Sequence, residues 1–183
     1  MVLEQTYYAV YLDHITENWG GSTYHAILVK EYPNENLEST ASTQTTTMDF
    51  LYPELIRNTY FLDGRAYGHF TLYNSHESDA STVSAYTVTL LKTADAPNAT
   101  VTLGTYSNTI TTKNNIAAKG YLVLPISINL SHENAEINAD EKLILRISIT
   151  QYSNGTINIS HANIASDEDI KITLPIVYGN MGH

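Results

Sequence analysis

Cysteine is absent from this chain of 183 residues, and basic residues are few. The absence of cysteine excludes disulfides, thiolate catalysis and zinc sites with cysteine ligands. Nine Lys and Arg residues against 19 Asp and Glu residues give a net charge of −10. Binding to nucleic acid or to an anionic membrane surface is therefore disfavoured, because both need a positively charged footprint.

Long apolar runs are lacking as well. No stretch reaches the roughly 18 apolar residues that a membrane-spanning helix needs. The first residues carry neither the basic region nor the apolar region of a secretory signal peptide, so none is expected. Segments with the period of an amphipathic helix are also missing, which leaves strands as the elements to look for.

Two segments in the second half of the chain carry the clearest strand patterns. Aliphatic residues recur at every second position in residues 121–130 and again in 142–150: Leu122, Leu124, Ile126, Ile128 and Leu130, then Leu143, Leu145, Ile147 and Ile149. Side chains of a strand alternate between its two faces, so each segment has one continuous apolar face. Both faces must be buried against another sheet, which predicts a β-sandwich.

Further β-prone segments precede and follow these two. They lie at residues 7–12, 24–29, 60–64, 68–73, 82–93, 99–104, 108–112, 157–161 and 170–176. Asp63-Gly64 predicts a turn, Asn154-Gly155 predicts a hairpin, and a bulge is expected near Gly104. Strands at this spacing predict an all-β fold, an antiparallel β-sandwich in which a jelly roll is the favoured topology.

The domain organisation is read from where these patterns begin. Residues 1–58 have weaker strand signals and are predicted to form edge strands with an extended arm or loop. Residues 59–183 are predicted to form the sandwich core, in one domain with the first part. The polar segment Leu37 to Thr47 is the candidate arm, although the N-terminal segment itself is an alternative.

Catalytic and metal-binding patterns are not found. The seven histidines have no metal-ligand spacing, and there is no Ser nucleophile elbow, phosphate-binding loop or dinucleotide fingerprint. Acidic residues gather at Glu133, Glu136, Asp140 and Glu141 and again at 167–169, where calcium is an alternative to plain solvated loops. No cofactor and no enzymatic activity are therefore expected; a sandwich-fold hydrolase is the least favoured alternative.

The composition points instead to contact surfaces. The chain has 14 Tyr against 3 Phe and 1 Trp, and interfaces are enriched in Tyr. The candidate interaction surface comprises Trp19, Tyr24, Tyr32, Leu37, Thr43 and Thr47. Trp19, which precedes two glycines, either stacks on a sugar together with nearby tyrosines (Tyr7, Tyr8, Tyr24, Tyr32) or anchors its loop onto the sandwich.

Four short motifs between residues 60 and 178 carry a family resemblance. They are Phe61 to Gly64, Thr87 to Leu90, Glu141 to Ile147 and Pro175 to Val177. In a Tyr-, Thr- and Ser-rich β chain without cysteine, these motifs resemble structural proteins of tailed bacteriophages and archaeal viruses, in particular capsid decoration or head-associated proteins.

The resemblance implies a non-enzymatic virion protein that stabilises a capsid through contacts of its β-domain and arm. It further implies a homotrimer located on the capsid surface, made in the host cytoplasm, with the major capsid protein or other virion proteins as partners. It transfers no functional residue. A carbohydrate-binding, lectin-like module, for instance on a phage fibre, is the alternative function, with a glycan as its ligand.

Overall fold

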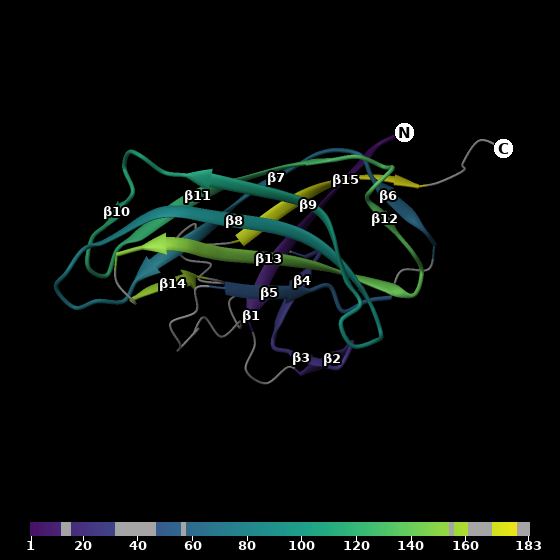
Figure 1. Ribbon diagram of the computed structural model, residues 1–183, viewed down its shortest axis with the longest axis horizontal. Coiled ribbons are helices and arrows are strands. Elements are labelled where there is room, and N and C mark those ends of the chain that lie inside the picture. The colour runs from purple at the N-terminus through teal and green to yellow at the C-terminus, as the bar shows by residue number, and fades with distance from the viewer. Residues whose placement is uncertain (12–15, 32–46, 56–57, 154–155, 161–169, 179–183) are drawn as a thin grey trace.

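The computed structural model describes residues 1–11, 16–31, 47–55, 58–153, 156–160 and 170–178 (Figure 1). Throughout this described part the regular elements are strands, and no helix occurs in it. Consequently no helix in these ranges is available to cross a membrane. The all-β fold class predicted from the periodicity is confirmed.

Nine strands follow one another across a large sheet. In spatial order they are β9 (Thr100–Thr109), β8 (Ser81–Ala94), β13 (Glu141–Tyr152), β5 (Thr47–Leu51), β4 (Ala26–Val29), β1 (Leu3–Tyr11), β15 (Ile170–Tyr178), β7 (Gly64–Asn74) and β11 (Tyr121–Leu130). All neighbours in this row are antiparallel except β4 and β5, which are parallel and joined only at Ile27 and Leu51. The sheet is therefore mixed.

Shorter strands extend the sheet at its margins. They are β6 (Tyr60–Leu62), β10 (Asn115–Ile116), β12 (Glu136–Ile137) and β14 (Ile157–Ser160). A separate hairpin, β2 (Glu17–Trp19) with β3 (Ser22–Tyr24), lies beside the large sheet (Figure 1).

The sheet curls until its two ends nearly meet. β9 and β11 share no ladder in the described residues, yet they approach each other closely at Gly104. A Cβ atom at Gly104 would lie 2.7 Å from Leu130 Cδ2 and 2.8 Å from Ile128 Cγ2, so a larger residue there would force these side chains to shift. The result is a nearly closed barrel, whereas the sequence predicted two separate sheets with jelly-roll topology.

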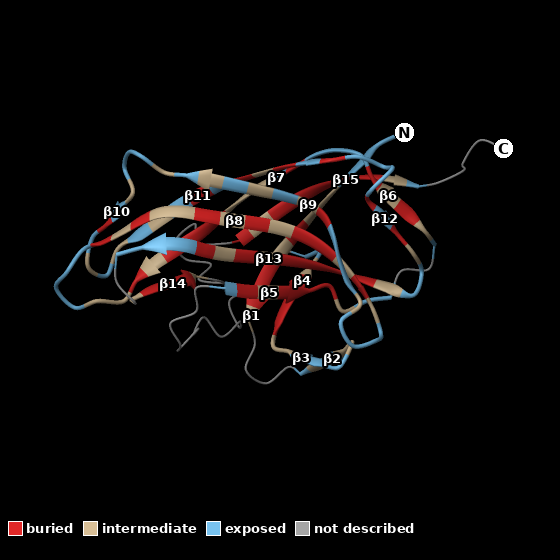
Figure 2. Ribbon diagram, in the orientation of Figure 1, coloured by how far each residue is buried: buried red, intermediate tan, exposed pale blue. Residues whose placement is uncertain are grey.

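The core lies between the two walls of this barrel (Figure 2). The alternating rows of β11 and β13 contribute to it as predicted: Leu124, Ile126, Ile128, Leu130, Leu143, Leu145, Ile147 and Ile149 are all buried. The two strands do not pair with each other. β11 pairs with β7, and β13 pairs with β8 and β5, so their apolar rows face the core from different parts of the sheet.

The N-terminal strands lie in the interior of the sheet. β1 is flanked by β4 and β15, and β5 by β4 and β13. The sequence predicted edge strands for residues 1–58, because their apolar runs are short. β4 and β5 are short, yet both lie in the middle of the sheet, because Leu28 of β4 and Phe50 and Leu51 of β5 are fully buried there.

Two predicted turns differ from the structure, and one predicted irregularity is present. Asp63-Gly64 does not reverse the chain: β6 and β7 both pair with β15 and continue along it, with Gly64 at φ +119°. β14 pairs with β7 and not with β13, so no hairpin joins β13 to β14; Asn154-Gly155 itself lies outside the described residues. The bulge expected near Gly104 is confirmed, since the register with β8 shifts there.

Candidate functional site

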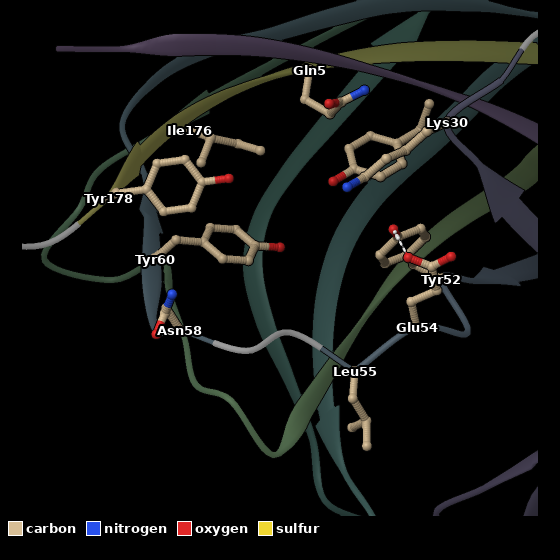
Figure 3. Close-up of a pocket in the computed structure, with 10 residues that line it drawn as sticks. Gln5, Lys30, Tyr52, Glu54, Leu55, Asn58, Tyr60, Ile176 and Tyr178 are labelled. Atoms are coloured by element: carbon tan, nitrogen blue, oxygen red, sulfur yellow. Dashed lines mark hydrogen bonds between the residues drawn. The ribbon is translucent and has the colours of Figure 1, made fainter.

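A cavity of about 300 Å³ opens between β1, β6, β15 and the segment that follows β5 (Figure 3). Its described walls are mostly polar and include four tyrosines. The described lining residues are Gln5, Tyr7, Lys30, Tyr52, Glu54, Leu55, Asn58, Tyr60, Ile176 and Tyr178. We call this cavity the tyrosine pocket.

Strand periodicity brings these side chains together. Gln5 and Tyr7 are two residues apart on β1, and Ile176 and Tyr178 are two apart on β15, so each pair lies on one face of its strand. Tyr60 of β6 is the cross-strand partner of Tyr178. β5 ends before Pro53, a residue that cannot donate to a ladder. This leaves Tyr52 and Glu54 at the mouth of the pocket.

The tyrosine rings are packed into the protein and their polar edges line the cavity. Tyr7 and Tyr52 contact each other edge to face with centroids 5.1 Å apart, and Tyr60 lies 6.3 Å from Tyr178. The first three are buried, whereas Tyr178 is 45% exposed. Figure 3 shows the hydroxyls of Tyr60 and Tyr178 pointing into the cavity.

Burial governs the protonation of these phenols. Burial raises the pKa of Tyr7, Tyr52 and Tyr60 well above the usual value, and the neighbouring phenols raise it further. The Tyr52 hydroxyl also donates a hydrogen bond of 2.8 Å to Glu54 Oε2, which adds to the rise in its pKa. All three are therefore neutral O–H groups at physiological pH; the Tyr52 proton is donated to Glu54, and its oxygen can still accept.

Among the described lining residues, the charged groups are Lys30 and Glu54. Lys30 Nζ lies 5.5 Å from the centre of the Tyr52 ring, a cation–π distance. Phenol hydroxyls, the side-chain amides of Gln5 and Asn58, one ammonium and one carboxylate thus surround a single small cavity. Such an arrangement suits a ligand that presents several hydrogen-bonding groups.

Trp19, singled out from the sequence, lies elsewhere. Its indole N–H donates to the carbonyl of Thr93 at 2.9 Å, and Lys142 Nζ lies 4.1 Å from its ring centre. The ring packs on an apolar cluster formed by Leu51, Leu91 and Ile144. These contacts hold the β2–β3 hairpin against the sheet.

Two other residues from that prediction lie close together. Tyr24 and Thr47 line an open hollow beside β3 and β5, where Asp49 also lies. Burial raises the pKa of Tyr24, and the Asp49 carboxylate raises it further. The remaining predicted surface residues, Tyr32, Leu37 and Thr43, lie outside the described residues, as do residues 37–46 of the segment proposed as an arm.

The acidic clusters show no metal centre in the described part of the chain, where no group of three His, Asp or Glu residues could hold an ion. Glu141 is instead engaged by protein groups: its Oε2 accepts from the Asn138 backbone N–H at 2.9 Å and lies 3.0 Å from Lys92 Nζ. The second cluster, residues 167–169, lies outside the described residues.

Sequence reasoning missed most of the tyrosine pocket. Of its residues, only Tyr7 was considered, as a stacking group for a sugar. The others are spread from residue 5 to residue 178 and become neighbours only through strand pairing. The available signal was the excess of Tyr over Phe: phenols in place of phenyl rings suit strands that must present polar groups to a cavity.

Comparison with known proteins identifies fold neighbours only. No family model and no curated protein matches the chain. Among solved structures, a CocE/NonD family hydrolase from Staphylococcus aureus is similar over 96% of this chain and 37% of its own, with 12% identity and a TM-score of 0.55. An aminopeptidase from a marine-sediment Thaumarchaeota archaeon matches over 93% and 34%, with 8% identity and a TM-score of 0.49.

An alpha-amino acid ester hydrolase matches over 72% of this chain and 24% of its own, with 9% identity and a TM-score of 0.45. The chain thus spans between about a quarter and somewhat over a third of the length of these hydrolases. At such low identity the likeness to the staphylococcal hydrolase shows a shared β fold.

Proposed function

We propose that this protein is a carbohydrate-binding β-module whose ligand is held in the tyrosine pocket. The observation that carries the proposal is the gathering of phenol, amide, ammonium and carboxylate groups around one cavity of about 300 Å³. A sugar offers hydroxyls that both donate and accept hydrogen bonds, and neutral phenols and amides can accept hydrogen bonds from these hydroxyls or donate to them. The half-exposed ring of Tyr178 offers an apolar face for the C–H side of a pyranose.

A binding role is proposed in preference to catalysis within this chain. Glycoside hydrolysis generally needs two carboxyl groups flanking the scissile bond. Among the described lining residues, Glu54 is the one carboxylate, and it is engaged by Tyr52. The staphylococcal hydrolase, which shares the fold, is matched over 37% of its own length, and this is compatible with an accessory role for the present chain.

The test is a glycan array followed by titration calorimetry with the sugars that bind. Tyr178→Ala removes the exposed ring at the pocket mouth, and Tyr152→Ala is the matched control, since Tyr152 is similarly exposed at the end of another strand. We expect binding to fall at least tenfold in the first variant and to stay unchanged in the second. An array without signal, or equal binding by both variants, would refute the proposal.

A virion structural role is the second proposal, and it is compatible with glycan binding on a viral fibre. It is supported by the sequence resemblance and by exposed apolar side chains on the outer face of β11, where Tyr121 and Val123 are each about half exposed. Such a face suits contact with another protein. Light scattering should then give a concentration-independent trimer, and mass spectrometry of purified particles should contain this chain; particles without it would refute the role.

A further inference from the structure

We propose that the tyrosine pocket selects acidic sugars, with the ligand's carboxylate held between the Lys30 ammonium and the hydroxyls of Tyr60 and Tyr178. This inference rests on the proposed carbohydrate-binding function and specifies the class of sugar.

Lys30 supplies an ammonium that forms no ion pair within the described part of the protein. The ion pairs among the described residues involve other cations, and the contact of Lys30 is the face of the Tyr52 ring, 5.5 Å away. Figure 3 shows its ammonium directed into the cavity, opposite the hydroxyls of Tyr60 and Tyr178. In a chain with 9 basic and 19 acidic residues, a cation directed into a cavity is a specific feature.

The phenols complete an anion site because they remain protonated. The rings of Tyr60 and Tyr178 lie 6.3 Å apart, and Figure 3 shows both hydroxyls directed into the same cavity. Burial, together with the neighbouring phenols, raises the pKa of Tyr60 well above its usual range, so its O–H is retained as a donor. Hydrogen bonds from a neutral O–H to a carboxylate are charge-assisted and are roughly twice as strong as neutral ones.

The position of the Glu54 carboxylate determines where the ligand's acidic group can bind. This carboxylate sits on the side of Tyr52 and accepts the Tyr52 hydroxyl at 2.8 Å. A second carboxylate beside it would be repelled, so the acidic group of the ligand is placed at the end formed by Tyr60 and Tyr178, with Lys30 across from it (Figure 3). The sugar hydroxyls then face Glu54, which can accept hydrogen bonds from them.

The experiment compares glucuronate, glucose and acetate by titration calorimetry at low and at physiological salt. Glucuronate and glucose differ only in having a carboxylate or a hydroxymethyl group at one carbon, and acetate carries the carboxylate without the sugar. We expect glucuronate to bind at least tenfold more tightly than either of the others. Higher salt should reduce this preference, because screening weakens the contribution of Lys30.

Variants of Lys30 identify the residue responsible. Lys30→Met should bring the affinities for glucuronate and glucose within about twofold of each other, whereas Lys30→Arg should keep the preference. Lys171→Met is the matched control, since it removes the same charge on β15 away from the pocket and should leave the preference intact. Urea unfolding of each variant verifies that the fold is retained.

The outcomes separate this inference from the proposed function. Equal binding of glucuronate and glucose would overturn the selection of acidic sugars and leave carbohydrate binding standing. Acetate binding as tightly as glucuronate would show a plain anion site, which overturns the carbohydrate-binding function and with it the choice of a sugar. Absence of binding by every sugar on the array would overturn both.

Discussion

The hydroxyl of Tyr86 on β8 donates a hydrogen bond of 2.6 Å to the backbone carbonyl of Pro125 on β11. The two strands belong to opposite ends of the curled sheet, where β9 and β11 share no ladder in the described residues. Asn108 Nδ2 on β9 donates in turn to the Tyr86 hydroxyl at 3.1 Å. One buried phenol thereby joins three strands across the gap that the backbone leaves open.

Replacing Tyr86 with Phe should lower the free energy of unfolding by about 0.5–1.5 kcal/mol, because the partly buried hydrogen bond to the carbonyl of Pro125 is lost. The ring remains, so its contact with Phe70 at 5.1 Å is kept and packing is not the cause. Urea unfolding followed by circular dichroism measures the loss. Tyr152→Phe, at an exposed position, should leave the midpoint unchanged; equal midpoints for both variants would show that this hydrogen bond does not close the barrel.

Asn74 is a buried amide that connects three loops. Its Nδ2 donates to the carbonyls of Asp79 and Ile116 at 2.9 and 3.0 Å, and its Oδ1 accepts from the Thr156 hydroxyl at 2.7 Å. Asn74→Ala leaves several buried polar groups without partners, so we expect a loss of about 3–5 kcal/mol.

Asn74→Asp distinguishes loss of volume from loss of donors. Aspartate keeps the shape of the side chain but replaces the donating Nδ2 with an oxygen that faces carbonyl oxygens. At neutral pH this variant should therefore lower the stability of the protein at least as much as Asn74→Ala. Thermal unfolding of both variants tests this, with Asn129→Ala on the exposed side of β11 as control. An aspartate variant as stable as the natural protein would contradict the assigned hydrogen bonds.

The Glu141 carboxylate should contribute to acid sensitivity. Its burial alone would raise its pKa, but the hydrogen bond from the Asn138 N–H and the Lys92 ammonium outweigh burial, so the pKa lies below its usual value. A lowered folded-state pKa stabilises the protein above the unfolded-state value, and this stabilisation is lost as the pH falls through the folded-state value.

Glu141→Gln should therefore be less stable than the natural protein at neutral pH, and the difference should shrink as the pH falls below about 4. Urea midpoints across the pH range measure this difference. Glu133→Gln, an exposed change in the same loop, should give a curve parallel to that of the natural protein. A Glu141→Gln difference that is constant with pH would refute the assignment.

Alkaline pH should unfold the protein through its buried phenols. Burial raises the pKa of Tyr86 to about 12 and raises that of Tyr7, Tyr52 and Tyr60 further. Each contributes stability that is fully present below the unfolded-state value of about 10 and is lost as the pH rises through the folded-state value.

We therefore expect part of the 14 tyrosines to ionise together with the loss of the β-sheet circular dichroism signal. Tyrosinate absorbance recorded alongside circular dichroism checks this coincidence. In Tyr60→Phe one phenolate fewer should appear in that cooperative step. Complete ionisation of every tyrosine while the sheet remains intact would contradict the burial of these hydroxyls.

The sequence by itself determined the local class of structure. A period of two in residues 121–130 and 142–150 predicts strands, and β11 and β13 confirm it, with every second residue from Leu124 to Leu130 and from Leu143 to Ile149 buried; in β13 Ile144, on the other face, is buried too. The bulge near Gly104 was also predictable, because glycine interrupts a strand that is otherwise regular. These features depend on the alternation of side chains and on local backbone freedom, both of which are written in neighbouring residues.

The tertiary structure alone decided which strands are neighbours. Asp63-Gly64 and Asn154-Gly155 have the composition of turns, yet β6 and β7 continue along β15, and β14 pairs with β7. The same long-range pairing brings Gln5, Lys30 and Tyr178 to one pocket. Which strands pair depends on the burial of whole sheet faces and on the closure of the sheet at Gly104 and Tyr86. Both contributions to the free energy come from residues far apart in the chain, so they leave no pattern among neighbouring residues.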